Sequence, residues 1–343
     1  MSPFYNNILC AHIFYFPACF INMFLTFYFH VENGVDLKKE ILRLKKEKGA
    51  VVMAHYYQKG EIQDLADYIG DSLALARIAA RCDAPIIVMC GVHFMAETAK
   101  ILCPDKKVLC PDVNAGCSLA DSCPAPELEE FLKDYPGYTV ISYVNTSAAV
   151  KALTDIVVTS GNARKIVEAL PADEKIVFGP DRNLGDYINS VTGRNMVLWD
   201  GACHVHEKFS LEKIEALKKE HPGAPLLVHP ECSRPLRMIA DKLGSTAVLL
   251  DYAGQSPAKE FIVATESGIL HEMRRKYPDK TFIPAPPDDS TCACNECAYM
   301  KINTLEKLYN TLRYELPEVN VAPEIIDKAR RPIERMLEMS ENK

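Results

Sequence analysis

The chain carries one pattern three times at nearly constant spacing, and this internal repeat restricts its possible folds more than any other feature. Three short apolar runs each end in a polar residue, and these ends lie 88 and then 86 residues apart. A segment with small hydroxyl residues follows each run at the same two spacings. The polar ends are His55, Tyr143 and His229, and the hydroxyl residues are Ser72, Ser160 and Thr246. Parallel series at one spacing indicate three homologous units around a pseudo-threefold axis.

The units are of the α/β type. Apolar runs of four to six residues, rich in β-branched side chains, alternate with helical patterns. Such runs are typical of buried parallel strands that helices cover on both faces. The runs are 51–55, 85–90, 106–110, 139–144, 155–160, 175–179, 195–199, 225–229, 246–250, 261–265 and 281–285. The predicted fold is three pseudo-threefold-related αβα sandwich domains with parallel sheets around a central active site.

The repeat also predicts domain limits. The three units are expected at 36–118, 119–203 and 204–300, with the helices of 301–343 packing on this core. Residues 1–35 form an apolar N-terminal extension, and its first thirty residues include no Lys, Arg, Asp or Glu. This stretch is long enough to span a bilayer, although Pro17, Asn22 and its aromatic excess weaken that interpretation. A hydrophobic membrane segment and sequence outside the functional domain therefore both stay open.

Charge and cysteine content exclude some classes of function. The net charge is −7 over 343 residues and the sequence has no long basic run, so no nucleic-acid partner is expected. No membrane partner is expected either. The chain has thirteen cysteines, an odd number that does not suit a complete disulfide framework. This usage favours a reducing compartment in which a few thiols are committed to a metal.

The repeated polar residues predict a central pocket. In open parallel sheets, ligands bind outside the carboxyl ends of the strands, and the three polar residues lie at such ends. The hydroxyl residues fall where helices should begin, and the free N–H groups of a helix start attract anions. A threefold arrangement would bring these groups together around a polyanionic substrate. Each hydroxyl taken alone also fits a plain helix cap.

Each unit ends at a cysteine, which predicts a metal centre. Cys117 and Cys203 are 86 residues apart, and the third unit ends in Cys292, Cys294 and Cys297. A structural zinc site usually closes with four ligands, whereas three thiolates suit a [4Fe–4S] cluster with one iron open as a Lewis acid. Spacing alone favours Cys292 as the third ligand. His204, next to Cys203, is expected to reach the cavity.

Twelve segments, in order from about residue 50 to beyond residue 300, match the motifs of one known family. They are MAHYYQ, GDSLALAR, FMAETAKIL, GCSLAD, YVNTSAAVKA, VVTSGNA, GPDRNLG, DGACHVHE, LVHPE, GSTA, VATESGI and CNECAYM. Together they resemble quinolinate synthase. The resemblance implies a cytosolic enzyme of de novo NAD synthesis that condenses iminoaspartate with dihydroxyacetone phosphate to quinolinate, losing phosphate and water. It implies three αβα domains, each donating one cysteine to a [4Fe–4S] cluster, and it suggests the enzyme that supplies iminoaspartate as a partner.

The resemblance also assigns residues by their place in the motifs. It selects Cys117, Cys203 and Cys297 as the three cluster ligands, in preference to Cys292. The expected substrate contacts are His55, Ser72, Tyr143, Val144, Asn145, Ser160, His229, Pro230, Glu231 and Thr246. The chemistry requires several proton transfers, for which Glu231 is expected to be the principal base, assisted by His229, Tyr57 and His55.

Two other functions stay open from the residues alone. A different [4Fe–4S] hydro-lyase would use the open iron on a simple hydroxy acid and would need no phosphate-sized pocket. A non-enzymatic metal-binding protein would instead use Cys292, Cys294 and Cys297 as a local metal site. These three cysteines could also form a redox-switching disulfide, and a pairing that includes Cys297 would remove a cluster ligand.

Overall fold

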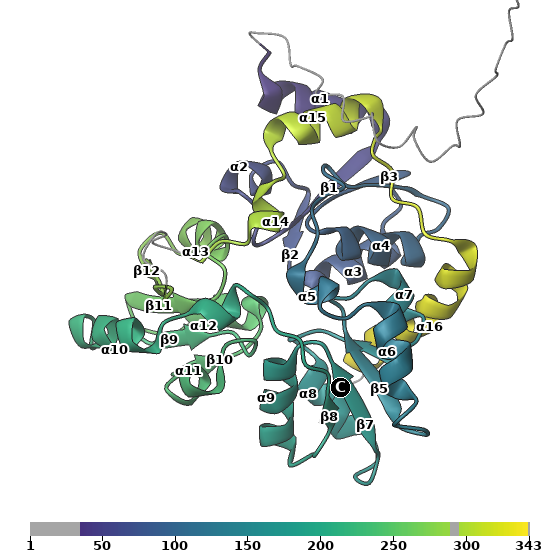
Figure 1. Cartoon of the computed structure of the whole chain (residues 1–343). Coiled ribbons are helices and arrows are strands. Elements are labelled where there is room, and N and C mark those ends of the chain that lie inside the picture. The colour runs from purple at the N-terminus through teal and green to yellow at the C-terminus, as the bar shows by residue number, and fades with distance from the viewer. Residues whose placement is uncertain (1–34, 289–294, 342–343) are drawn as a thin grey trace, which may run out of the picture. The chain divides into compact units, whose positions relative to one another are not determined.

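The computed structural model describes residues 35–288 and 295–341, and this part of the chain contains three parallel sheets with one strand order (Figure 1). The first sheet is ordered β2-β1-β3-β4, with β1 (Ala50–His55), β2 (Tyr68–Gly70), β3 (Ile86–Cys90) and β4 (Lys107–Leu109). The second is ordered β6-β5-β7-β8, with β5 (Thr139–Tyr143), β6 (Ile156–Val158), β7 (Ile176–Gly179) and β8 (Val197–Leu198). The third is ordered β10-β9-β11-β12, with β9 (Leu226–Val228), β10 (Lys242–Leu243), β11 (Glu260–Ala264) and β12 (Thr281–Pro284). This repeated topology confirms the predicted α/β class with three parallel-sheet units.

The repeat extends to the hydrogen bonds that place the second strand of each unit. An aspartate precedes that strand, and its carboxylate accepts the backbone N–H of a residue in the first strand. Its own backbone N–H donates to the carbonyl of the same residue. The pairs are Val52–Asp67, Val140–Asp155 and Leu226–Asp241, with N–H to carboxylate distances of 2.7, 2.8 and 2.7 Å. The aspartate thus satisfies strand groups that the shorter neighbouring strand does not reach.

Helices connect the strands and cover the sheets. The first unit contains α1 (Leu37–Lys48), α2 (Gly60–Gln63), α3 (Ser72–Arg81) and α4 (His93–Leu102). Next come α5 (Ser118–Asp121), α6 (Ala125–Leu132), α7 (Ala148–Lys151), α8 (Ala163–Ala169) and α9 (Arg182–Thr192). The third unit contains the 3₁₀ turn η2 (His206–Lys208), α10 (Leu211–Glu220), α11 (Arg234–Met238), α12 (Thr246–Gln255) and α13 (Ile269–Lys276). The chain ends with α14 (Ala298–Lys301), α15 (Leu305–Tyr314) and α16 (Pro323–Glu341).

Local signals explain the first helix. The Asp36 side chain accepts the N–H of Lys39 at the start of α1, and Gly49 ends the helix in the left-handed conformation with φ 59°. Ile41 and Leu44 are buried, as the amphipathic pattern predicts. The following strand β1 is then buried along most of its length.

In the third unit, each central strand contributes side chains to two hydrophobic cores, one on each face of the sheet. Leu227 and Val263 pack on the side of α12 and α13, whereas Leu226 and Ile262 pack on the side of α10 and α11. Successive side chains of a strand point to opposite faces, so strands that are apolar throughout fit a sheet covered on both sides. This is the αβα arrangement that the unbroken apolar runs predict.

The C-terminal helices pack on the first two units. Helix α15 lies against α1 and β3, and α16 lies along β6, α7, α8 and α4 (Figure 1). Each sheet falls inside one of the predicted units 36–118, 119–203 and 204–300. The boundaries themselves stay a prediction.

One strand prediction is wrong, and two strands lack an apolar run in the sequence. Residues 246–250 begin helix α12, because the Ser245 side chain caps it by accepting the N–H of Val248 at 3.5 Å. Strands β2 and β10 have only three and two residues and were missed. In the described residues, no helix is both long and apolar enough to cross a membrane. Residues 1–34 lie outside the described part, so both interpretations of the N-terminal extension stay open.

Candidate active site

One pocket collects the predicted site residues of all three units. The first unit contributes His55, Tyr57, Ser72 and Cys117 to its lining. The second contributes Tyr143, Val144, Asn145, Ser160 and Cys203, and the third contributes His229, Glu231, Thr246 and Cys297. Pro230 is buried but does not line the pocket. The strand-end positions therefore do converge, as the repeat predicts.

Two strand-end histidines are held in the same way. The backbone N–H of Tyr57 donates to His55 Nδ1 at 3.1 Å, and that of Glu231 donates to His229 Nδ1 at 3.4 Å. Because Nδ1 accepts in both rings, the neutral imidazoles carry their proton on Nε2. Burial lowers the pKa of each histidine to about 3, so both are neutral at pH 7. His229 Nε2 lies 3.2 Å from Ser160 Oγ.

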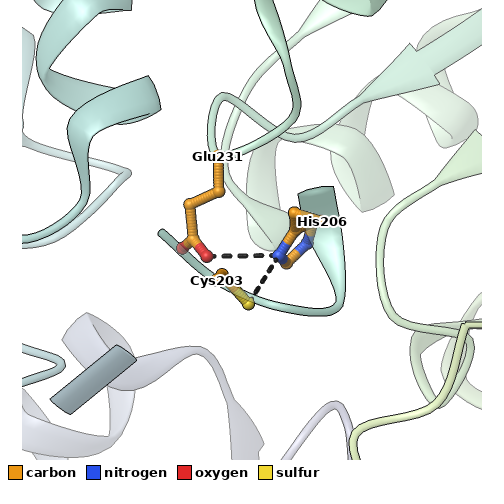
Figure 2. A group of neighbouring side chains, drawn as sticks. All are labelled: Cys203, His206 and Glu231. Carbon is orange, nitrogen blue, oxygen red and sulfur yellow. Dashed lines mark hydrogen bonds and ion pairs between the residues drawn. The ribbon is translucent and has the colours of Figure 1, made fainter. Parts of the chain in front are cut away.

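Glu231 is a buried carboxylate surrounded by hydrogen-bond donors. Tyr143 donates its hydroxyl to Oε1 at 2.5 Å, and His206 Nδ1 lies 3.1 Å from Oε2 (Figure 2). Burial raises the pKa of Glu231, but His206, His229 and the Tyr143 hydroxyl outweigh it and lower the pKa to about 2. Glu231 is therefore ionised at pH 7 and can accept a proton.

His206 is a site residue that the sequence reasoning missed. It is buried and stacks on His229, with ring centroids 4.6 Å apart, and its Nδ1 lies 3.3 Å from Cys203 Sγ. The prediction that His204 reaches the cavity is wrong: His204 does not line the pocket, and its Nδ1 bonds to the Ser118 hydroxyl instead. The motif DGACHVHE contains both histidines, and the turn η2 after Cys203 directs the second one inward.

A chain of hydrogen bonds links Tyr57 to Glu231 through His206. The Tyr57 hydroxyl lies 2.8 Å from Thr246 Oγ1 and 2.7 Å from Thr265 Oγ1. Thr265 Oγ1 lies 3.0 Å from His206 Nε2, and His206 Nδ1 reaches Glu231. Burial, then Glu231, raises the pKa of Tyr57 well above its ordinary value, so its hydroxyl stays protonated. The arrangement offers a hydroxyl donor at one end and a carboxylate acceptor at the other.

The hydroxyl residues sit at helix starts, but they are not the caps. Asp71 caps α3 by accepting the N–H of Ala74, and Ser245 caps α12, so Ser72 and Thr246 are the first residues inside their helices. Ser160 precedes α8 by three residues. Because neighbouring residues do the capping, the hydroxyls of Ser72 and Thr246 are left to line the pocket. The alternative that Ser72 and Thr246 are plain helix caps is thus wrong.

The three predicted cysteine ligands line the same pocket, one from each unit. Cys117 and Cys297 are the residues just before α5 and α14, and Cys203 comes shortly before η2. Burial raises the pKa of each of these thiols, and backbone N–H groups of the following turn act against that rise, namely those of Leu119 and Ala120, of His206, and of Tyr299 and Met300. Such N–H groups favour thiolates in iron–sulfur sites.

The donor set fits a group held by three thiolates. Burial raises the pKa of Cys117 to about 12 and raises those of Cys203 and Cys297, so these thiols ionise when a metal replaces the proton. Among the described cysteines, only these three line the pocket. The side chains of Cys203, His206 and Glu231 also bring ligand atoms within 4.8 Å of one another, which makes them a candidate metal group (Figure 2). Cys292 and Cys294 lie outside the described residues.

Buried carboxylates fix two of the cysteines. Asp181 Oδ2 accepts the backbone N–H of Cys203 at 2.9 Å, and Glu266 Oε1 accepts that of Cys297 at 3.1 Å. Glu266 also pairs with Lys301 Nζ at 2.9 Å. The second and third units therefore use the same device to hold their thiols.

Comparison with known proteins agrees with this site. The model of the quinolinate synthetase A protein (NadA) family matches residues 39–338. A quinolinate synthase from Synechococcus sp. is 56% identical over 305 residues, which cover 89% of this chain and 95% of the relative. The quinolinate synthase of Chloroherpeton thalassium is 55% identical over 308 residues, covering 90% and 96%, and that of Nostoc punctiforme is 56% identical over 309 residues, covering 90% and 95%.

A family match over most of the chain, with relatives that align along nearly their whole length, leaves one conclusion: the chain belongs to the quinolinate synthase family and is an enzyme of that family.

Proposed function

We propose that the pocket condenses iminoaspartate with dihydroxyacetone phosphate to quinolinate, with loss of phosphate and water. The observation that carries the proposal is the single pocket in which three cysteines, an ionised glutamate and hydroxyls at helix starts meet, from all three units. The names of the relatives support the product. We further propose a cytosolic enzyme, because a reducing compartment keeps the thiols free.

Substrate binding is assigned to polar groups that line the pocket at two helix starts and after one strand end. Ser72 and Thr246 present hydroxyls at the N-terminal ends of α3 and α12, where free N–H groups favour anions. Asn145 lines the pocket, and its Oδ1 has no hydrogen-bond partner among the described residues. A buried amide without a partner costs free energy, which suits a group that a ligand completes.

Proton transfer is assigned to Glu231 and the groups around it. Glu231 accepts a proton from substrate carbon or nitrogen, since its pKa of about 2 keeps it ionised. The protonated Tyr57 hydroxyl donates a hydrogen bond to developing negative charge, whereas the Tyr143 hydroxyl donates to Glu231. His229 and His55 assist as neutral donors through Nε2, and His206 joins them through its contacts with Thr265 and Glu231.

We propose that Cys117, Cys203 and Cys297 hold a [4Fe–4S] cluster. Three thiolates would leave one iron open, and the chemistry supplied there is Lewis acidity toward a hydroxyl that leaves as water. The remaining residues of the pocket bind, orient and exchange protons with the substrates. The enzyme that supplies iminoaspartate is proposed as a partner, because an imine hydrolyses in water and benefits from direct transfer.

The experiment is a quinolinate assay on protein prepared without oxygen and given both substrates. We expect quinolinate to form only when dihydroxyacetone phosphate is present. Dehydration of a simple hydroxy acid, with no need for the triose phosphate, would replace the proposal with a hydro-lyase. Metal binding by residues 288–300 that does not need Cys117 or Cys203, without turnover, would replace it with a metal-binding protein.

A further inference from the structure

The pocket has little positive charge of its own. Among the described residues its lining includes no lysine or arginine, whereas it includes the side chains of Asp71, Glu231 and Glu266. His55 and His229 are neutral at pH 7, because burial lowers the pKa of both to about 3. A pocket of this kind repels multiply charged anions unless a positive charge lies behind its wall.

Two lysines lie behind the wall, a partly exposed one and a fully buried one, and they differ in their partners. Lys301 Nζ is 2.9 Å from Glu266 Oε1, so a neighbouring carboxylate offsets its charge. Lys151 is fully buried and, within the described part of the chain, takes part in no ion pair. Its Nζ donates to the carbonyl of Val144 at 2.8 Å and to that of Thr146, and it lies 5.4 Å from the centre of the Phe94 ring. Val144 and Phe94 both line the pocket.

Lys151 is charged at neutral pH. Burial lowers its pKa to about 8, and Glu97 and Cys117 act in the opposite direction. Most molecules therefore carry the ammonium at pH 7. The Glu97 carboxylate itself accepts the backbone N–H of Ala148 at 3.0 Å and lies beyond ion-pair distance of Lys151. In a medium of low polarity such a charge acts over several ångströms.

The internal repeat shows that the loop beside Lys151 does not need a charge to hold it. Positions 63, 151 and 237 are equivalent, because each lies on the short helix after the first strand of its unit, 88 and 86 residues apart. Gln63 donates to the carbonyls of Tyr56 and Gln58, both at 2.9 Å, and does so with a neutral amide.

The third unit has an arginine at this position, and its charge is paired. Arg237 Nε donates to the Cys232 carbonyl at 3.0 Å, and its second nitrogen reaches Asp186 at 2.5 Å. Only in the second unit, therefore, does the side chain that donates to the loop carbonyls also carry a positive charge that is not in an ion pair with a carboxylate.

We propose that Lys151 is a specificity-determining residue that makes the pocket prefer ligands with two negative charges, through its charge behind Val144 and Phe94 and not by touching the ligand. The inference rests on the proposed function for the anionic class of the ligand. It adds the residue that supplies the positive charge, which the lining of the described pocket lacks.

The test replaces Lys151 with a residue of the type that the first or the third unit has at the equivalent position. Lys151→Gln keeps a donor for the loop carbonyls, as in the first unit, and removes the charge. Lys151→Arg keeps the charge, as in the third unit. The probes are quinolinate, with two negative charges, and pyridine-2-carboxylate, with one, titrated calorimetrically into the full-length enzyme with its metal centre. We expect Lys151→Gln to weaken quinolinate binding about tenfold and pyridine-2-carboxylate binding about threefold, whereas Lys151→Arg stays within about threefold of the parent for both.

A matched substitution controls for loss of packing. Arg237→Gln makes the equivalent change where Asp186 already offsets the charge, so the ratio of the two dissociation constants should stay at the parental value. An unchanged ratio in Lys151→Gln would overturn the inference and leave Lys151 as a loop support only. If Lys151→Arg does not fold, the ratio measured with Lys151→Gln still decides.

Failure of the proposed function gives a different result. If the parent enzyme binds inorganic phosphate but not quinolinate, the proposed reaction fails. The affinity of Lys151→Gln for phosphate is then compared with that of the parent. About tenfold weaker binding of phosphate by the variant supports the inference. If the parent binds neither quinolinate nor phosphate, the pocket has no affinity for dianions and the inference is overturned too.

Discussion

At the scale of single residues, the site places neutral donors around the Glu231 carboxylate. His55 and His229 are buried and neutral, and the hydroxyls of Tyr57 and Tyr143 keep their protons. Only Glu231, with donors on both of its oxygens, is held as a carboxylate with a lowered pKa. Groups whose pKa values are moved apart in this way are suited to separate acid and base roles.

Replacing Glu231 with glutamine removes the proposed base and keeps the shape of the side chain. We expect turnover to fall by roughly 100- to 10,000-fold, while the visible absorption of the metal centre stays that of the parent. The Tyr143 hydroxyl can still donate to the amide oxygen, so the fold should be kept. Steady-state quinolinate formation, measured beside the absorption spectrum, checks both parts, and turnover at the parental rate would remove Glu231 from the mechanism.

The two histidines after Cys203 provide a matched pair. His206→Gln breaks the link between Thr265 and Glu231 and the stacking on His229, so turnover should fall at least tenfold. His204→Gln changes a residue that contacts Ser118 and Tyr299 outside the pocket lining, and turnover should stay within about threefold. Equal losses in the two variants would contradict the assigned chain of hydrogen bonds.

Sequence reasoning found the strand-end residues because their position is set by the repeat, and it failed where side-chain direction decides. Spacing places Ser72 and Thr246 at helix starts, and the structure shows that the neighbouring Asp71 and Ser245 do the capping. His204 and His206 are indistinguishable by motif, since the direction of each depends on the tight turn between them. The choice among the cysteines of the third unit depended on the family pattern, because Cys297 lies farther from Cys203 than the repeat spacing of 86 residues.

At the scale of elements, carboxylates tie neighbouring segments together. The lysine-rich end of α1, strand β4 and the end of α15 meet at Glu315, whose oxygens lie 2.7 Å from Lys48 Nζ and 2.5 Å from Lys107 Nζ. Glu315 ends α15 in the left-handed conformation, with φ 56°. These two ion pairs join α15 to the first unit.

This junction predicts a dependence of stability on pH. Hydrogen bonds from Lys107 and then Lys48 lower the pKa of Glu315 to about 2. A lowered pKa in the folded state contributes stability above the ordinary value near 4.5, and this contribution is lost as the pH falls toward 2. Because the side chain is partly exposed, we expect Glu315→Gln to cost about 1 kcal/mol at pH 7, with the difference from the parent shrinking below pH 4.5.

Denaturant unfolding at several pH values measures that difference. The control is Glu338→Gln, which removes a partner from an exposed pair with Arg331 and should change the free energy of unfolding by less than about 0.5 kcal/mol. A Glu315→Gln protein as stable as the parent at pH 7 would show that the junction does not contribute to stability.

Strand prediction succeeded where burial on both faces made the sequence uniformly apolar, as in β3 and β11. It failed for β2 and β10, since their two or three residues pair mainly through the backbone and the neighbouring aspartate. It also failed at 246–250, where an apolar run with β-branched residues forms a helix because Ser245 caps it. Apolar runs of five residues do not distinguish a buried strand from a buried helix.

At the scale of the whole molecule, three copies of one unit build a site that none could build alone. Each contributes a strand end, a helix start and a cysteine to one pocket. The central claim is that the three thiols hold one metal centre together, so that losing any one of them abolishes the centre. A local site within residues 292–297 would instead depend on the third unit only.

The measurement that tests this claim most directly is iron and sulfide content of single cysteine-to-serine variants reconstituted without oxygen. We expect the parent to hold about four irons and four sulfides per chain, and Cys117→Ser, Cys203→Ser and Cys297→Ser to lose the active centre. Cys123→Ser, which changes a buried thiol outside the pocket lining, should keep it, as should Cys292→Ser and Cys294→Ser. Stoichiometric zinc without sulfide in the parent, or a full iron–sulfur centre in Cys117→Ser or Cys203→Ser, would contradict the account.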